Sequence, residues 1–163
     1  MCKSAVIVGN ELSAYSFGEK HPLNSKRLEA FWSTLNHSES MQTGNLKLLS
    51  PTLADEYTVA SFHEKKYVDF VKKSSITGLG YLDSGDTPSF KGVFDASMYV
   101  VGSTILALDT VVNRTNGIVH AFNPIGGLHH ARRNAAGGFC VLNDIGIAIL
   151  YARRKYDLKK ILY

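Results

Sequence analysis

The sequence predicts an α/β fold of three layers, in which a mainly parallel sheet is flanked by helices. Short apolar runs at residues 5–8, 46–49 and 117–122 have the length and composition of buried strands. Apolar residues at helical spacing follow or precede them, above all over residues 93–114. The strands and helices therefore alternate along the chain, as they do around parallel sheets.

The first half of the chain contains two of these strands. The run at 5–8 ends at Gly9, and the run at 46–49 ends before Pro51. A helix is predicted to start at Asn24 or Ser25, because four large apolar residues then recur on one helical face: Leu28, Phe31, Trp32 and Leu35. Two short helices, over 53–60 and 64–73, are expected next.

The second half is built around one long helix and one long loop. Residues 74–91 are rich in glycine and small polar residues and are expected to form a loop. The helix over 93–114 has little polar face, which predicts burial against the sheet. A strand over 117–122, a loop over 126–144 and a helix over 141–155 follow, and Asn143 and Asp144 are expected to cap that helix. The apolar residues at 160–163 predict the start of another strand.

The composition is that of a globular domain of 163 residues, with 45% hydrophobic and 20% charged residues. The net charge of +4 is modest and no basic stripe is interleaved with aromatics, so nucleic acid is an unlikely partner. Two cysteines, Cys2 and Cys140, indicate a reducing compartment. We see no signal peptide and no run long enough to span a bilayer, which predicts a cytoplasmic protein with no membrane contact.

The candidate chemistry lies in the loop after the third strand. Glycine pairs at 126–127 and 137–138 bracket two adjacent histidines, His129 and His130. Glycines allow a turn that directs both imidazoles into one pocket, and histidines exchange protons near neutral pH. The alternative is a surface turn in which the two histidines have no chemical role.

The run GGLHHARRNAAGGFCVLND resembles the active-site segment of the histone deacetylase family, which includes acetoin-utilisation and acetylpolyamine deacetylases. The HP-x4-R element from His21 to Arg27 and the tract SFHEKKYVDFV resemble two further segments of that family. The resemblance implies the arginase/deacetylase fold. It also implies a zinc-dependent hydrolase that cleaves the amide of an acetylated amine, of the acetyl-lysine or acetylpolyamine type.

By the same resemblance, His129 and His130 are the catalytic pair, with His130 the general base and His129 an electrostatic partner. Asp86 corresponds to the aspartate on the pocket rim that holds the substrate backbone, and it is favoured over Asp83 by counting back from residues 92–95. The alternative interpretation of both Asp83 and Asp86 is that they stabilise a turn. Gly138 and Phe139 are expected to line the substrate tunnel. Leu128 stands where many relatives carry tryptophan.

Three other residues carry two interpretations each. Arg27 is either a charge on a helix surface or, by resemblance, a structural or exit-channel residue beneath the site. His63 is interpreted as a structural residue at a helix start rather than a ligand. Cys140 is interpreted as a small buried hydrophobe rather than a nucleophile, because no third group in the sequence orients a Cys-His pair.

No metal ligands are assigned. In the family that the chain resembles, zinc is bound by residues that follow the equivalent of Tyr163, so residues 1–163 are expected to be the N-terminal part of a single deacetylase domain that ends before the metal-ligand segment. This incomplete chain is expected to be inactive alone. Its exposed sheet edge would favour self-association or pairing with the missing C-terminal half.

Two other functions stay open. The chain could be a non-catalytic binding module, or a split-enzyme subunit, derived from the same fold. A nucleotide-binding α/β domain is disfavoured, because no G-x-G-x-x-G or P-loop pattern follows any predicted strand.

Overall fold

The computed structural model describes residues 3–163, so Cys2, one of the two cysteines behind the expected reducing compartment, lies outside the described residues. The elements follow one another in the order β1 (Lys3–Ile7), α1 (Asn10–Ser13), α2 (Ser25–Asn36), α3 (Glu39–Gln42), β2 (Leu46–Leu49), α4 (Glu56–Ala60), α5 (Lys65–Thr77), α6 (Val93–Val112), a short 3-10 helix (Thr115–Gly117), β3 (Ile118–Phe122) and α7 (Asp144–Tyr156).

Over residues 3–163 the sheet has three strands in the order β2-β1-β3, and both pairings are parallel. Ala5 of β1 lies opposite Lys47 on one side and Ala121 on the other. Because β1 is central, its residues Ala5, Val6 and Ile7 are buried, whereas β2 and β3 are only partly covered. The predicted mainly parallel sheet is confirmed.

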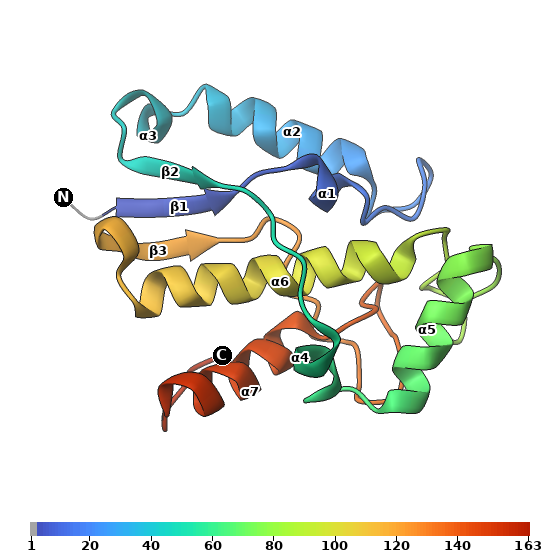
Figure 1. Ribbon diagram of the computed structural model, residues 1–163. Coiled ribbons are helices and arrows are strands. Elements are labelled where there is room, and N and C mark those ends of the chain that lie inside the picture. Colours follow the sequence, from blue (N-terminus) through green and yellow to red (C-terminus); the bar gives the residue numbers. More distant parts are fainter. Residues whose placement is uncertain (1–2) are drawn as a thin grey trace.

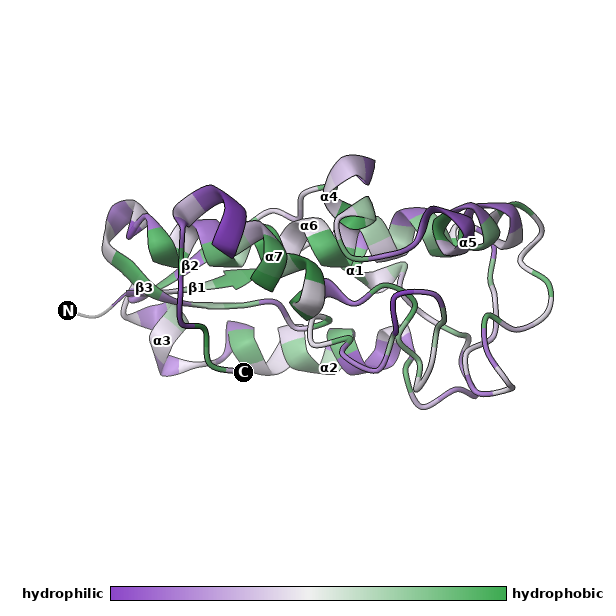
Figure 2. Ribbon diagram, turned by 90° about the horizontal axis from the view of Figure 1, so that it is seen from below, coloured by the Kyte–Doolittle hydropathy of each residue, from purple (hydrophilic) through white to green (hydrophobic). Residues whose placement is uncertain are grey.

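Helices cover both faces of the sheet, which gives the predicted three layers (Figures 1 and 2). α2 lies on one face, where the ring of Phe31 is 5.6 Å from that of Phe122 at the end of β3. α6 lies on the other face against β3, and α7 packs on α6 (Figure 1). The loops that follow the strands lie at the edge of the three layers toward which the strands point (Figure 1).

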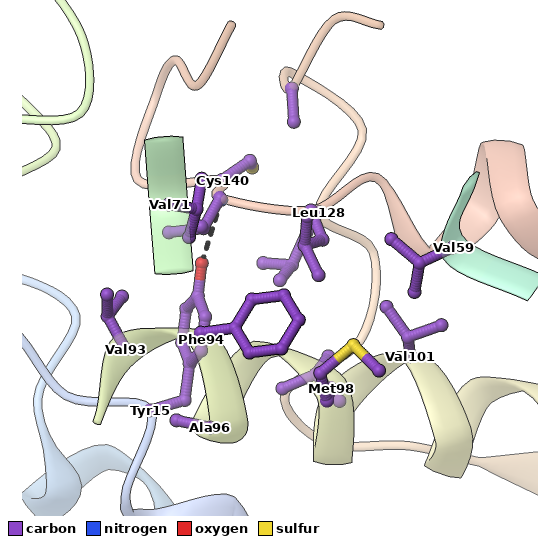
Figure 3. Packing of buried hydrophobic residues seen from close by; sticks show 14 of the residues in the cluster. Tyr15, Val59, Val71, Val93, Phe94, Ala96, Met98, Val101, Leu128 and Cys140 are labelled. Atoms are coloured by element: carbon purple, nitrogen blue, oxygen red, sulfur yellow. Dashed lines mark hydrogen bonds between the residues drawn. The ribbon is translucent and has the colours of Figure 1, made fainter. Parts of the chain in front are cut away.

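The main core forms where α6 meets the loops. Phe94 and Met98 of α6 pack with Leu128 of the histidine-bearing loop, and Val71 of α5 lies beside Cys140 (Figure 3). Burial of these side chains fixes the loop segments relative to the helices, because well-packed cores deform little.

α6 corrects one expectation. By length and composition alone it could cross a membrane, since an 18-residue window has a mean hydropathy of 1.3. The statement that no run is long enough was therefore wrong. Core helices pass the same test, and α6 is packed against β3, α5 and α7.

Two further expectations differ from the structure. α5 continues to Thr77, into the predicted loop, and ends where Gly78 takes a left-handed conformation with φ of 69°. The predicted strand at 160–163 was wrong. These residues pair with no strand of the described chain, and Ile161, Leu162 and Tyr163 instead line one side of a cavity whose other residues belong to α6 and α7. A short apolar run does not by itself distinguish a strand from an extended coil.

Candidate functional site

One wall of the candidate site comes from the loop that follows β3, the strand next to the central strand β1. The chain leaves β1 toward β2 on one side and returns to β3 on the other. The carboxyl ends of strands at such a switch in strand order are where open α/β sheets bind ligands. Figure 1 shows the loop after β3 running out on the side to which the strand arrows point.

A pocket of about 700 Å³ lies between two segments of this region. One wall comes from the loop before α6, and the opposite wall comes from the loop after β3. The lining residues are Asp83, Ser84, Gly85, Asp86, His130, Arg132, Ala135, Ala136, Gly137 and Gly138. Of the predicted site residues, the structure brings together His130, Asp86 and Gly138 in this pocket.

His130 faces the pocket because of the glycine beneath it. A Cβ atom on Gly138 would lie 3.0 Å from Cγ of the His130 ring, and Gly138 has a φ of +54°. Only glycine combines that backbone conformation with so close an approach without strain. Within residues 3–163 the His130 ring nitrogens have no recorded hydrogen-bond partner, so both are free to meet a ligand.

His129 lies next to His130 but outside the pocket lining. The two ring centroids are 4.3 Å apart, with 48° between the ring planes. His129 Nδ1 forms a short hydrogen bond with the Tyr163 hydroxyl. The loop was expected to direct both imidazoles into one pocket, but only His130 is among the residues that line this cavity.

Asp83 organises the opposite wall. Its Oδ1 accepts three backbone N–H groups, those of Gly85, Asp86 and Thr87, at 2.9 to 3.1 Å. Its Oδ2 accepts the Thr87 hydroxyl at 2.6 Å. Burial alone would raise the pKa of the Asp83 carboxyl, but the hydrogen bonds it accepts around residues 85–87 hold that pKa well below its usual range. Asp83 thus shapes the turn, as its alternative interpretation held.

Asp86 joins the two walls. Its Oδ1 accepts the Gly138 N–H at 3.2 Å, and beside it the Phe139 N–H donates to Thr87 Oγ1 at 3.1 Å. Thr87 is fully buried. Residues 52 positions apart in the sequence are therefore tied together at the mouth of the pocket.

Phe139 has a positive φ of 67°, which is uncommon for a residue with a side chain. The buried Tyr15 hydroxyl holds this turn by donating to Phe139 O at 2.8 Å and accepting the Val141 N–H at 3.0 Å. The Phe139 ring packs against His21, with centroids 4.5 Å apart. The expected tunnel-wall residue is not among those that line the 700 Å³ pocket.

Asn143 and Asp144 hold the backbone of the loop that carries His129 and His130 (the histidine loop). Asn143 caps α7 through Gly146, as expected, and its Nδ2 also donates to His129 O at 3.1 Å and Ala131 O at 2.8 Å. The Asp144 carboxylate is fully buried and accepts the N–H groups of residues 127 and 128. Burial raises the pKa of Asp144, and these hydrogen bonds oppose that shift.

His63 confirms its structural interpretation. It is 2% exposed, its Nε2 accepts the Asn143 N–H at 2.9 Å, and its Nδ1 lies 3.3 Å from Arg133 O. These partners require the neutral ring with its proton on Nδ1. Burial lowers the pKa of His63 to about 4.

Arg27 and Cys140 lie outside the main pocket. Arg27 is exposed on α2 and lines a separate cavity of about 260 Å³, which Leu128 also lines. Cys140 is buried, its Sγ lies 3.4 Å from Gly138 O, and burial raises the pKa of its thiol. A buried thiol whose pKa is raised is a poor nucleophile, which agrees with the expected packing role.

Four residues hold the pocket loops by hydrogen bonds that the sequence analysis did not predict: Tyr15, Thr87, Asn143 and Asp144. Their partners in the loop are contacted through backbone groups, so no residue pattern identifies them. The capping position of Asn143 and Asp144 was the one visible signal.

The residues described do not fit a zinc site by themselves. Among residues 3–163 no three His, Cys, Asp or Glu side chains converge on a position that could hold a metal ion. His129 and His130 supply two imidazoles, but a zinc site in proteins takes three or four protein ligands.

Comparison with known proteins identifies the family. The model of the histone deacetylase domain matches residues 21–163. The chain belongs to the histone deacetylase family. The matched region contains the pocket and both histidines.

The individual relatives agree with this assignment. The chain is 33% identical over 170 residues to the acetoin utilization protein AcuC of Bacillus subtilis (strain 168), and all of the chain and 43% of that protein are covered. It is 32% identical over 159 residues to histone deacetylase 6 of Arabidopsis thaliana, with 91% of the chain and 32% of that protein covered. The chain thus spans less than half the length of these relatives.

Proposed function

We propose that this chain carries the proton-transfer histidine and the substrate rim of a zinc-dependent deacetylase that hydrolyses the amide of an acetylated amine. Membership of the histone deacetylase family supports an amide hydrolase. The observation that carries the proposal is His130 in the pocket, with free ring nitrogens and with Asp86 on the opposite rim.

His130 acts as the general base and acid in this proposal. Hydrolysis of an amide requires a proton to leave the attacking water and another to reach the leaving amine, and an imidazole exchanges protons near neutral pH. His129 supports it electrostatically, because its ring is 4.3 Å away and lies outside the pocket lining.

Asp86 and Gly138 hold the substrate. One Asp86 oxygen is bound to the Gly138 N–H, which leaves the other carboxylate oxygen to accept amide hydrogens from an acylated lysine or polyamine. Gly138 gives the substrate stem close access to the backbone. Phe139 contributes to the wall beyond this pocket, and Arg27 contributes to the cavity behind Leu128.

Zinc would polarise the acetyl carbonyl and activate the attacking water when bound. Since the described residues do not fit a zinc site, we propose that its ligands come from a polypeptide segment other than residues 3–163. The chain alone is then inactive. We place the complete enzyme in the cytoplasm, with acetylated amines as its substrates.

The test measures acetate release from an acetyl-lysine peptide and from an acetylpolyamine, with zinc present. The 163-residue chain is assayed alone and then mixed with a polypeptide that carries the unmatched remainder of the Bacillus subtilis AcuC protein. We expect turnover only in the mixture, and a loss of about 10²-fold to 10⁴-fold in His130→Ala. His120→Ala, an exposed histidine on β3, is the control and should leave the rate unchanged.

Turnover by the chain alone, with stoichiometric zinc, would contradict the assignment of the ligands to another segment. Full activity of His130→Ala would contradict the proposed role of that residue.

A second function is favoured by the missing third ligand: a non-catalytic module that binds an acetylated amine in the same pocket. This module would bind an acetyl-lysine peptide with an affinity that Asp86→Asn weakens. It would release no acetate under any of the conditions above.

A further inference from the structure

Two side chains, those of Asn143 and His63, contact backbone carbonyl groups of the loop that carries His129 and His130. Successive odd-numbered carbonyl groups, those of residues 129, 131 and 133, each meet a side-chain nitrogen. Asn143 Nδ2 binds the first two, and His63 Nδ1 lies 3.3 Å from the third. These contacts hold the backbone on both sides of Arg132, between the turn at residues 129–130 and the turn at residues 133–134.

His63 and Asn143 form one connected unit. The Asn143 N–H donates to His63 Nε2 at 2.9 Å, and both residues are buried. His63 is held in turn at the start of α5, where the Glu64 N–H also donates to Arg133 O at 2.8 Å. The imidazole therefore sits between the loop and the start of α7 and contacts both.

We propose that His63 is a positioning residue for the histidine pair and acts through Asn143. The inference rests on the proposed function of His129 and His130. Its neutral ring accepts from Asn143 and donates to Arg133, which sets the backbone from which both catalytic-site imidazoles project. His63 is not among the residues that line the pocket.

A different result is expected if His63 only stabilises the fold and does not position the histidine pair. Removal of such a residue would lower stability but would leave the rings of His129 and His130 in place in the molecules that remain folded. If His63 is a positioning residue, the rings should move in those folded molecules, because the loop and Asn143 lose the side chain that contacts both, although the Glu64 N–H still binds Arg133 O.

The experiment uses the 163-residue chain, labelled with ¹³C and ¹⁵N in its histidines and backbone. His63→Ala removes both contacts. His63→Gln keeps an oxygen acceptor for the Asn143 N–H and loses the contact with Arg133 O. His37→Gln, on an exposed histidine after α2, is the matched control.

We expect the ring signals of His129 and His130 to move in His63→Ala, and the Asn143 amide to exchange with solvent about fivefold or more faster. His63→Gln should recover most of both changes, and His37→Gln should cause neither. A folded His63→Ala whose His129 and His130 signals coincide with those of the wild type would overturn the proposal.

If His63→Ala does not fold, Asn143→Asp carries the test. The carboxylate keeps an oxygen for the Gly146 cap but removes the two N–H donors to His129 O and Ala131 O. The ring signals of His129 and His130 are then expected to move, and unchanged signals would overturn the proposal in the same way.

The activity measurement separates this proposal from the proposed function. In the zinc assay with the complementing polypeptide, His63→Ala should lower kcat about tenfold or more at unchanged KM, since binding residues are untouched, and His63→Gln should recover part of it. If no mixture is active, the proposed function fails, while the ring signals still decide the role of His63.

Discussion

At the scale of single residues, buried hydroxyl and imidazole groups determine how the pocket is held. Tyr15 shows this most directly, because one hydroxyl bridges Phe139 O and the Val141 N–H across 124 and 126 residues of sequence. Burial raises the pKa of Tyr15 well above its ordinary value, so the hydroxyl keeps its proton and can donate at any physiological pH.

Removal of that hydroxyl should destabilise the fold. Tyr15→Phe leaves a backbone carbonyl and a buried N–H without their partner, which costs about 2 kcal/mol in the free energy of unfolding. Urea denaturation followed by circular dichroism measures this cost. The control is Tyr57→Phe, on a tyrosine that is 75% exposed, where a change below about 0.5 kcal/mol is expected.

His63 should make stability depend on pH. Its pKa is lowered to about 4 in the fold, from 6.5 in an unfolded chain, so the unfolded chain binds this proton first as the pH falls. The contribution of His63 is fully present above about pH 6.5 and is lost toward pH 4, by up to about 3 kcal/mol. The charged or titratable side chains recorded around the ring are Arg133 and Tyr67.

Denaturation at a series of pH values checks this dependence. The free energy of unfolding of the wild type should fall between pH 6.5 and 4 more steeply than that of His63→Gln, because glutamine at position 63 does not titrate. Parallel curves for the two proteins would contradict it.

At the scale of elements, α6 organises the chain through its small residues as well as its large ones. Gly102 lies against the segment before α4, where an added Cβ would be 2.1 Å from Thr52 O and 2.7 Å from the carbonyl carbon of Leu53. Thr52 Oγ1 donates to Gly102 O at 3.0 Å across the same contact. Backbone atoms occupy this space, so no side-chain rotation can relieve a clash.

Gly102→Ala should therefore destabilise the protein although alanine is the better helix former. The helix propensity gain is about 1 kcal/mol, and overpacking against fixed backbone costs about 1–3 kcal/mol, so we expect a net loss of up to about 2 kcal/mol. Thermal and urea unfolding measure it. Ser33→Ala on the exposed side of α2 should change stability by less than about 0.5 kcal/mol.

The elements with strong local patterns were predictable from the sequence. The helix over 93–114 was predicted from its apolar period and observed as α6, and Asn24 and Asn143 cap α2 and α7 as their positions suggested. The strand at 160–163 was wrong, because pairing depends on a neighbouring strand and not on the apolar run alone.

The sequence predicted residues that line the pocket, but it did not predict the hydrogen bonds that hold the loop in place. Glycines around His129 and His130 indicated a turn into a pocket, and His130 lies there. The hydrogen bonds of Thr87 and Asp144 join the loop to residues 52 and 16 to 17 positions away through backbone N–H groups. Every residue except proline has such a group, so the sequence carries no trace of these pairings.

At the scale of the whole molecule, the sheet has two open edges. Each outer strand, β2 and β3, has one neighbour among the strands described, and Leu48 and Phe122 on them are 42% and 52% exposed. Unpaired strand edges with apolar side chains favour association with another chain. Self-association of this chain therefore stays a prediction that solution measurements can decide.

Light scattering coupled to size exclusion should give a mass that rises with protein concentration. Leu48→Lys places a charge on the β2 edge and should lower the fraction of associated chains, whereas Glu29→Lys on exposed α2 should not. A single monomer mass at all concentrations would contradict this expectation.

The joint between the two walls of the pocket has one further consequence. The Asp86–Gly138 and Thr87–Phe139 hydrogen bonds connect segments that the sheet does not join, and the first of them is exposed to solvent. These two hydrogen bonds can therefore break by local opening while the sheet and its covering helices stay folded. A molecule that contacts both walls would bind only while these hydrogen bonds are formed, so its binding would stabilise the joined walls by a free energy that rises with the logarithm of ligand concentration above its Kd.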